Sequence, residues 1–495
     1  MFSNIHEDTI FNAVLIFSWV TFLWETYLAS RQRSLAKSST KVPAELKGVM
    51  EQESFDKAKS YHLDKSTFGL CNSLYSQIES TLILWYGGFP FLWNLSSSLQ
   101  SNLNLPGGEI IQSLVFMVIG MVFSSITSLP WSLYSTFVIE EKHGFNKQTL
   151  GFFFKDTLKH MAVMLAISLP VTASLIFIIQ AGGDYFFIYA WLFAFTVSLV
   201  LVTIYADYIA PLFDKFTPLP DGELRTRIEN LAHSINFPLT KLFVVEGSKR
   251  SSHSNAYFYG FFNNKRIVLF DTLLEDYAPE NKEKEEKKNE QVDSADKEEN
   301  NDSDTKEKST QEERELKDEN KESESEIKEN EGKKKKKKGC SNDEVLAVLS
   351  HELGHWYLNH VLKQLVLSQV NLFLCFMVFA VLMKKTILYA AFGFSTQPTL
   401  IGLIIIFQFI FAPYNEVLSF IITHITRKFE FQADAFAVKL KYGVLLRSSL
   451  IKLNEDNLSF PLSDWLYSAW HFSHPPLLDR IKALEIDVEG NKKTQ

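Results

Sequence analysis

The run EVLAVLSHELGHWYLNH, residues 344–360, holds the side chains with the most specific chemistry. His351 and His355 are four residues apart, so on a helix they lie about 40° from each other around the axis and can bind one metal ion. Glu352 would lie beside the ion without being a ligand. The alternative is a helix with polar residues on a wet face. Residues 345–349 are apolar, however, and two unpaired imidazoles would be costly there.

A second pair of polar residues could complete such a site. A catalytic zinc needs a third protein ligand and an open position for water. The run RKFEFQADAFA contains Glu430 and Asp434, again four residues apart. We expect Glu430 to be the third ligand and Asp434 to accept the outer N–H of a zinc-bound histidine, which would fix its orientation. The alternative is a surface helix on which these carboxylates pair with Arg427 and Lys428.

Two histidines and one glutamate around zinc predict hydrolysis of peptide bonds. Zinc lowers the pKa of a bound water to about 7. Glu352 would take the proton of this water as general base and pass it to the leaving amine. The oxyanion needs a further donor. The run WHFSHPPLLDR offers His471 and His474, and His474, held before two prolines, is the preferred donor; the alternative is that HPP only starts a helix.

Two further histidines are predicted to lie outside the site. His360 comes after the motif and is predicted to be a surface residue. His424 lies at the end of an apolar stretch. Neither is included among the metal ligands.

Most of the chain consists of apolar stretches that must position these residues in a membrane. A helix needs about 20 mostly apolar residues to cross a bilayer. Seven stretches come close to this length, and they cover residues 10–29, 78–95, 110–129, 158–179, 186–208, 365–383 and 400–422. The second is interrupted by GGFPF. The sequence therefore predicts a mainly α, multi-span membrane protein.

The distribution of positive charge predicts how the chain is oriented. Lys and Arg follow the first, third and seventh stretches, whereas the connections after the second and fourth contain neither. Lys384 and Lys385 are a contrary pair after the sixth. The pattern places the N-terminus in the lumen and the protease part and C-terminus in the cytosol. The final residues KKTQ fit a dilysine retrieval signal, which requires a cytosolic tail.

A soluble segment lies between the fifth and sixth stretches. Residues 240–247, 254–262 and 265–274 are predicted to be strands. Residues 276–342 are rich in Lys, Glu, Asn and Ser and are predicted to be a disordered insertion. The expected parts are 1–212 with spans one to five and their loops, 213–275 with the strands, 276–342, 343–362 with the zinc helix, 363–423 with spans six and seven, and 424–495 with the third ligand.

Composition excludes some classes of protein. The net charge of −8 arises from 58 acidic and 50 basic residues, many of them in the insertion, so no nucleic-acid partner is expected. The three cysteines are far apart in the sequence and form no CxxC pair, so neither a disulfide framework nor a cysteine zinc site is expected.

Several motifs together resemble one family. HELGHW, NAYFYGFF, LIGLIIIFQFIFAPYNEVLSF, RKFEFQADAFA and FSHPPLLDR are similar to motifs of the type I CAAX prenyl endopeptidases, which are seven-span zinc metalloproteases. The resemblance implies one zinc, a helical barrel around an intramembrane chamber, and a glutamate-zincin α+β protease domain. It implies a location in the endoplasmic reticulum membrane and the inner nuclear membrane. The implied reaction removes the last three residues after a prenylated cysteine. Some members make a second, upstream cut.

The resemblance also implies roles for individual residues. The zinc ligands would be His351, His355 and Glu430, and the general base would be Glu352. Asn255, Ala256 and Tyr257 match an edge strand that binds the substrate backbone by strand addition. His474 and Arg480 match a C-terminal motif that contributes to the site, Arg480 as a substrate-binding residue. The implied partners are a prenylated CAAX protein or peptide and membrane lipid, and the oligomeric state stays open.

Two alternatives remain from the sequence. One is a quality-control metalloprotease of the membrane that needs no lipid on its substrate. The other is a membrane scaffold with a structural zinc, against which Glu352 argues because a structural site needs no base beside the ion. No residue in the sequence demands a prenyl group.

Overall fold

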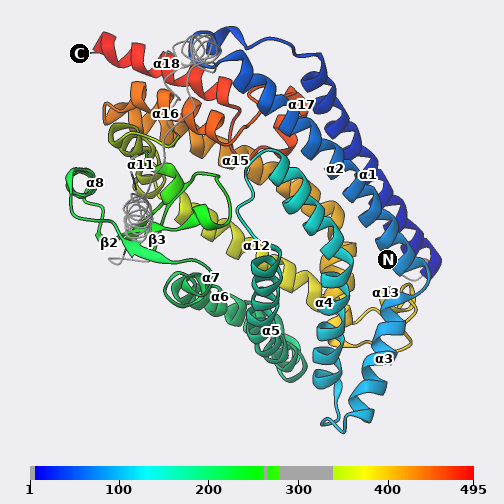
Figure 1. Ribbon diagram of the computed structural model, residues 1–495. Helices are drawn as coiled ribbons and strands as arrows, with labels where there is room; N and C mark the ends of the chain where they lie inside the picture. The colour runs from blue at the N-terminus through cyan, green and yellow to red at the C-terminus, as the bar shows by residue number, and fades with distance from the viewer. Residues whose placement is uncertain (1–5, 261–264, 276, 278–337, 495) are drawn as a thin grey trace, which may run out of the picture.

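The computed structural model describes residues 6–260, 265–275, 277 and 338–494 (Figure 1). Most of the predicted insertion lies outside these residues, as does the turn that the sequence predicts at Asn263-Asn264 between the second and third strands. The end of the insertion is described, and there the predicted boundary is wrong. The Cys340 N–H donates to Leu273 O at 2.6 Å, and Cys340 forms a parallel bridge with Leu274. The residues just before 343 therefore belong to the folded protease domain.

Helices make up most of the described chain, as predicted. Their bounds are α1 (Glu7–Ser38), α2 (Gln52–Trp85), α3 (Gly88–Asn102), α4 (Glu109–Tyr134), α5 (Leu150–Ala181), α6 (Phe186–Ile204), α7 (Ala210–Phe213), α8 (Glu223–Ser234), α11 (Asn342–Tyr357), α12 (His360–Leu382), α13 (Thr386–Ala390), α14 (Thr399–Ile404), α15 (Ala412–Lys439), α16 (Gly443–Asp456), α17 (Trp465–His471) and α18 (Leu477–Thr494). The connection between the first two predicted spans is itself largely helical, since α2 begins at Gln52.

The apolar helices are arranged in a closed ring. Each contacts the next in the order α1, α2, α3, α4, α5, α6 and α12. The π-helical segment η7 (Ile405–Ile410) contacts both α12 and α15. Helix α17 contacts both α15 and α1 and so closes the ring. This arrangement agrees with the predicted barrel (Figure 1).

Five of these helices are long and apolar enough to cross a membrane. They span Glu7–Ser38, Glu109–Glu140, Leu150–Ala181, Gly183–Ile204 and His360–Leu382. A sixth span results if Thr399–Ile410 and Ala412–Lys439, which are bent by 59°, are taken together. The second predicted stretch is divided between α2 and α3 and is not among them, so a seventh span stays a prediction.

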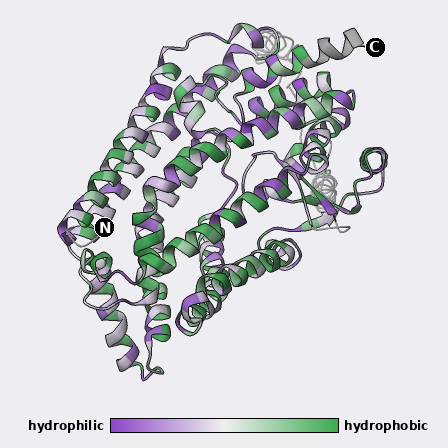
Figure 2. Cartoon of the chain, turned by 180° about the vertical axis from the view of Figure 1, so that it is seen from behind, coloured by the Kyte–Doolittle hydropathy of each residue, from purple (hydrophilic) through white to green (hydrophobic). Residues whose placement is uncertain are grey.

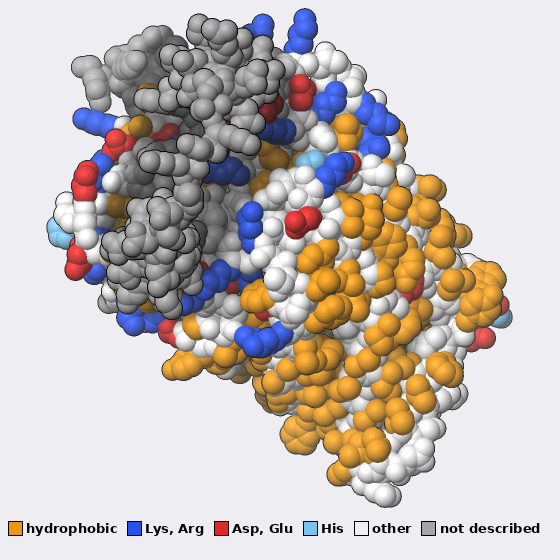
Figure 3. All heavy atoms as spheres, in the orientation of Figure 1, with side chains coloured by type: hydrophobic (Ala, Val, Ile, Leu, Met, Phe, Trp, Pro, Cys, Tyr) orange, Lys and Arg blue, Asp and Glu red, His pale blue; other side chains and the backbone are white. Residues whose placement is uncertain are grey.

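The surface agrees with a membrane location. Apolar residues dominate the lower helices in both cartoon and space-filling views (Figures 2 and 3). Large apolar side chains such as Phe177, Val202, Val370 and Val417 are exposed there, which in water would be unfavourable. Lys and Arg gather instead toward the protease domain (Figure 3). The two halves of the molecule therefore face different solvents.

A four-stranded sheet forms part of the protease domain. Its order is β1 (Phe216–Pro218), β2 (Leu239–Val245), β4 (Lys265–Phe270) and β3 (Ala256–Tyr259). β2 and β4 are parallel, and the other pairs are antiparallel. All three predicted strands are present; β1 was not predicted, because it has only three residues and ends in proline. β3 lies at the edge of the sheet.

Helix α11 is held firmly between the sheet and the C-terminal helices. It contacts β3, α8, α15 and α16. A capping box fixes its first turn: Ser341 accepts from the Glu344 N–H, and the Glu344 carboxylate accepts from the Ser341 N–H. Residues Val345 to Leu349 are almost fully buried. The apolar half of the motif thus anchors the helix, and its histidines follow one turn later.

Candidate metal centre

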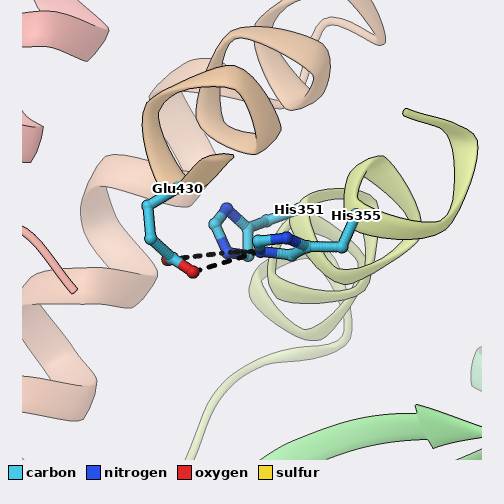
Figure 4. A group of neighbouring side chains, drawn as sticks. All are labelled: His351, His355 and Glu430. Atoms are coloured by element: carbon cyan, nitrogen blue, oxygen red, sulfur yellow. Dashed lines mark hydrogen bonds and ion pairs between the residues drawn. The ribbon is translucent and has the colours of Figure 1, made fainter. Parts of the chain in front are cut away.

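Two helices supply the three predicted ligands (Figure 4). His351 and His355 extend from α11, and Glu430 reaches them from α15. His351 Nε2 lies 3.4 Å from Glu430 Oε2, and His355 Nε2 lies 3.3 Å from Glu430 Oε1. The two Nε2 atoms are 3.2 Å apart. Residues separated by α12, α13, α14 and η7 in the sequence therefore converge on one point.

The donor atoms fit a metal ion. Glu430 is 3% exposed, and its Oε2 is buried without a well-oriented hydrogen-bond donor among the described residues, although His474 Nδ1 lies 2.8 Å away. A buried carboxylate facing two imidazoles is costly unless a cation joins it. Two nitrogens and one oxygen at this spacing form the donor set of a catalytic transition-metal site.

Asp434 and Arg480 orient the first histidine from behind. His351 Nδ1 lies 2.8 Å from Asp434 Oδ1, so Nδ1–H donates to Asp434 and Nε2 is turned toward Glu430. Burial lowers the pKa of His351, but hydrogen bonds to Asp434 and Glu430 outweigh this and raise the pKa to about 9. The pocket thus favours a positive charge at this position, which a metal ion would supply in place of the proton.

Arg480 was predicted to bind substrate, but the structure places its side chain against Asp434. Its Nε and Nη2 donate to the two oxygens of Asp434 at 2.9 and 2.6 Å, and its side chain is only 11% exposed. It therefore holds Asp434 in place behind the ligands, and its role as a substrate-binding residue stays a prediction. The alternative of a surface helix is also wrong, because Glu430 and Asp434 are buried and Arg427 donates to Ser468.

His360 was expected on the surface, and this prediction is wrong. It is 1% exposed and stacks on Phe429, with ring centroids 4.2 Å apart. In a continuous helix, a residue five positions after His355 would point about 140° away from it. Helix α11 ends before Asn359, however, whose φ of 56° turns the chain so that His360 folds back. The sequence signal was this asparagine, a residue that tolerates the left-handed region.

His360 completes a hydrogen-bond relay behind the second histidine. Its Nε2 lies 3.0 Å from Gln432 Oε1, so Nε2–H donates and Nδ1 is left to accept. His355 Nδ1 lies 3.1 Å from that Nδ1 and donates to it. The Nε2 lone pair of His355 therefore faces Glu430. Neither Gln432 nor His360 was predicted to take part.

The remaining predicted residues surround the centre. Glu352 follows the first ligand on α11 and is partly exposed. The His474 side chain is 68% exposed even though its Nδ1 lies 2.8 Å from Glu430, so its ring borders open space. Ala256 and Tyr257 lie in β3, and exposed Asn255 precedes it. His471 pairs instead with Glu25 of α1 at 3.0 Å.

The site combines two histidines, a glutamate directly after the first of them, and a distant carboxylate ligand beside a sheet with an edge strand. Built into a ring of apolar helices, these features define a membrane-embedded metallopeptidase. Comparison with known proteins specifies the class further. Residues 31–215 match the family "CAAX prenyl protease N-terminal, five membrane helices", and residues 218–487 match "Peptidase family M48".

Individual relatives agree over nearly the whole chain. The CAAX prenyl protease 1 homologs of Mus musculus and Homo sapiens are each 59% identical over 481 residues, 97% of this chain and 96% of theirs. The crystal structure of S. mikatae Ste24p superimposes with a TM-score of 0.78 at 33% identity, covering 97% of this chain and 99% of that one. The chain belongs to the CAAX prenyl protease family of M48 metallopeptidases.

Proposed function

We propose that this protein is a zinc endopeptidase that removes the last three residues of prenylated CAAX proteins, and that it also makes an upstream cut in some of them. The observation that carries the proposal is the convergence of His351, His355 and Glu430 beside Glu352. The names of the relatives, which match over 97% of the chain, supply the substrate class.

His351, His355 and Glu430 would hold one zinc ion. When bound, zinc supplies an acidified water and polarises the substrate carbonyl. Glu352 accepts a proton from that water and later donates it to the leaving amine. Asp434 and His360 keep the Nε2 lone pairs of the two histidines directed at the ion.

His474 would donate to the oxyanion of the reacting carbonyl. Its Nδ1 lies close to Glu430, and most of its side chain is exposed. It lies directly before Pro475 and Pro476, which restrict the backbone there. A donor held in this way costs little reorganisation when charge develops.

The free edge of β3 would bind the substrate backbone. Ala256 and Tyr257 pair with Leu269 and Val268 of β4, and no strand among the described residues pairs with the other side of β3, so that side can accept a further strand. Asn255, just before β3, would contact the same peptide. Arg480 acts behind the centre through Asp434.

The cellular setting follows from charge and family. We propose that the protein lies in the endoplasmic reticulum membrane and the inner nuclear membrane. Its N-terminus would be lumenal and its protease domain cytosolic or nucleoplasmic. Lys and Arg after the first, third and seventh predicted spans support this orientation.

Purified full-length protein in lipid should be incubated with a farnesylated CAAX peptide and its unprenylated twin. We expect rapid cleavage of the first and slow cleavage of the second. Equal cleavage of both would favour the quality-control protease, and no cleavage of either with zinc present would favour the scaffold.

A further inference from the structure

A cavity of about 760 Å³ lies between α1, α2, α17 and the segment after α16. We call it the terminal cavity. Aromatic and aliphatic side chains make up much of its wall, among them Phe22, Leu70, Leu458, Phe460, Tyr467 and Phe472. Its volume is within the range of sites for small ligands. An apolar tripeptide would fit this wall.

The terminal cavity adjoins the metal centre. A neighbouring cavity of about 360 Å³ is lined by His474, which lies 2.8 Å from Glu430. The two cavities share four lining residues, which are Ser459, Phe460, His471 and Phe472. The terminal cavity is therefore linked to the surroundings of the metal centre through residues next to His474.

The edge strand sets the direction of that peptide. A substrate added antiparallel to β3 runs its C-terminal residues toward the N-terminal end of β3. His253 lies just before that end and lines the terminal cavity. Three extended residues reach only about 10 Å, so a carboxylate at their end must be bound close to the centre.

Lys65 is the one Lys or Arg among the described residues that line the terminal cavity. Its side chain is 52% exposed, and its Nζ lies 3.2 Å from Tyr61 Oη and 3.7 Å from Glu140 Oε1. Glu140 is not a lining residue, and it also accepts from Tyr61 at 2.8 Å. Lys65 therefore keeps part of its donor capacity for a ligand in the cavity.

The other titratable groups of the wall do not oppose an anion. Glu25 is the acidic lining residue, and it is paired with His471 at 3.0 Å and Trp470 at 2.9 Å. His62 Nε2 is buried without a hydrogen-bond partner among the described residues. His253 Nδ1 lies 3.2 Å from Asn457 Oδ1, and its Nε2 lies 3.4 Å from Tyr61 Oη.

We propose that the terminal cavity holds the three residues after the scissile bond and that Lys65 binds their free carboxylate. The enzyme thereby recognises the C-terminus of its substrate, and this specificity rests on the function proposed above. Lys65 is a binding residue for the released tripeptide and takes no part in the proton transfers.

The test compares a farnesylated CAAX peptide that has a free carboxylate with the same peptide as a C-terminal amide. For the wild type we expect kcat/KM to be about 10- to 100-fold higher for the acid, because a charge-assisted hydrogen bond is lost in the amide. Lys65→Met should lose this preference through a slower reaction of the acid alone, with the change mainly in KM. Lys65→Arg should restore most of it.

Lys57→Met is the matched control, because Lys57 is an exposed lysine of α2 that pairs with Glu53 and does not line the cavity. It should keep the wild-type preference. Equal cleavage of acid and amide by the wild type would overturn the proposal without any variant, as would an undiminished preference in Lys65→Met. Cleavage of neither peptide by the wild type would overturn the proposed function itself.

Discussion

In the metal centre the carboxylates Glu430 and Asp434 are buried and bind the ligand histidines, whereas Lys65 and His253 of the terminal cavity stay partly open to solvent. Glu430 and Asp434 are 3% and 1% exposed. The side chains of Lys65 and His253 are 52% and 38% exposed. The difference separates two tasks: the centre must keep a fixed geometry for chemistry, and the cavity must admit and release a peptide. Changes in the centre should slow all substrates alike, and changes in the cavity should alter the choice between substrates.

The largest effect is expected for Glu352→Gln, which removes the base. We predict a fall in kcat of about 10²- to 10⁴-fold for acid and amide peptides alike. The bound metal should stay, because Glu352 is not a ligand, and elemental analysis would check this. An unchanged rate would contradict the mechanism, and a change in the ratio between the peptides would break the separation of tasks.

His474→Ala should have the next largest effect, because it removes the donor to the oxyanion. We predict a fall in kcat of about 10²- to 10³-fold with little change in KM, measured with the farnesylated peptide. His424→Ala is the control, since His424 is an exposed histidine of α15 that bonds to Phe420 O. Equal effects of the two variants would exclude His474 from the reaction.

Asp434→Asn should have a smaller effect, on metal affinity. Asparagine leaves His351 without its charged acceptor, and we predict metal affinity lowered by about 10- to 100-fold in a competition with a chelator. Asp479→Asn is the control, because Asp479 lies beside Arg480 in sequence but is half-exposed. If both variants retained the wild-type affinity, the proposed orienting role of Asp434 would be wrong.

The sequence predicted the centre better than the cavity for a physical reason. The ligands lie on two helices with regular spacing, so the four-residue period alone places His351 with His355 and Glu430 with Asp434. The contact of His360 with His355 was not predicted, because the turn at Asn359 breaks that period. Lys65, His253 and His471 come from segments without a shared period, and only the closure of the helical ring brings them to one cavity.

The elements of the fold with a regular sequence pattern were likewise predicted better than those without one. Apolar length predicted the spans that are single uninterrupted helices, and short runs of β-branched and aromatic residues predicted β2, β3 and β4. The second stretch was less regular, because Tyr86 and Gly87 break it between α2 and α3, with Gly87 at a φ of 65°. The polar half of α2, which carries Lys65, buries Phe55, Ala58 and Tyr61, but such a stripe indicates only a packed helix and does not mark Lys65 as part of a site.

The most direct test of the metal centre is the zinc content of the purified full-length protein and of Glu430→Gln, measured by elemental analysis beside peptide cleavage. We predict one zinc per wild-type chain, loss of most of it in Glu430→Gln, and loss of cleavage in proportion. Removal of zinc from the wild type by a chelator should abolish cleavage, and added zinc should restore it. Full zinc content and full cleavage in Glu430→Gln would contradict the account.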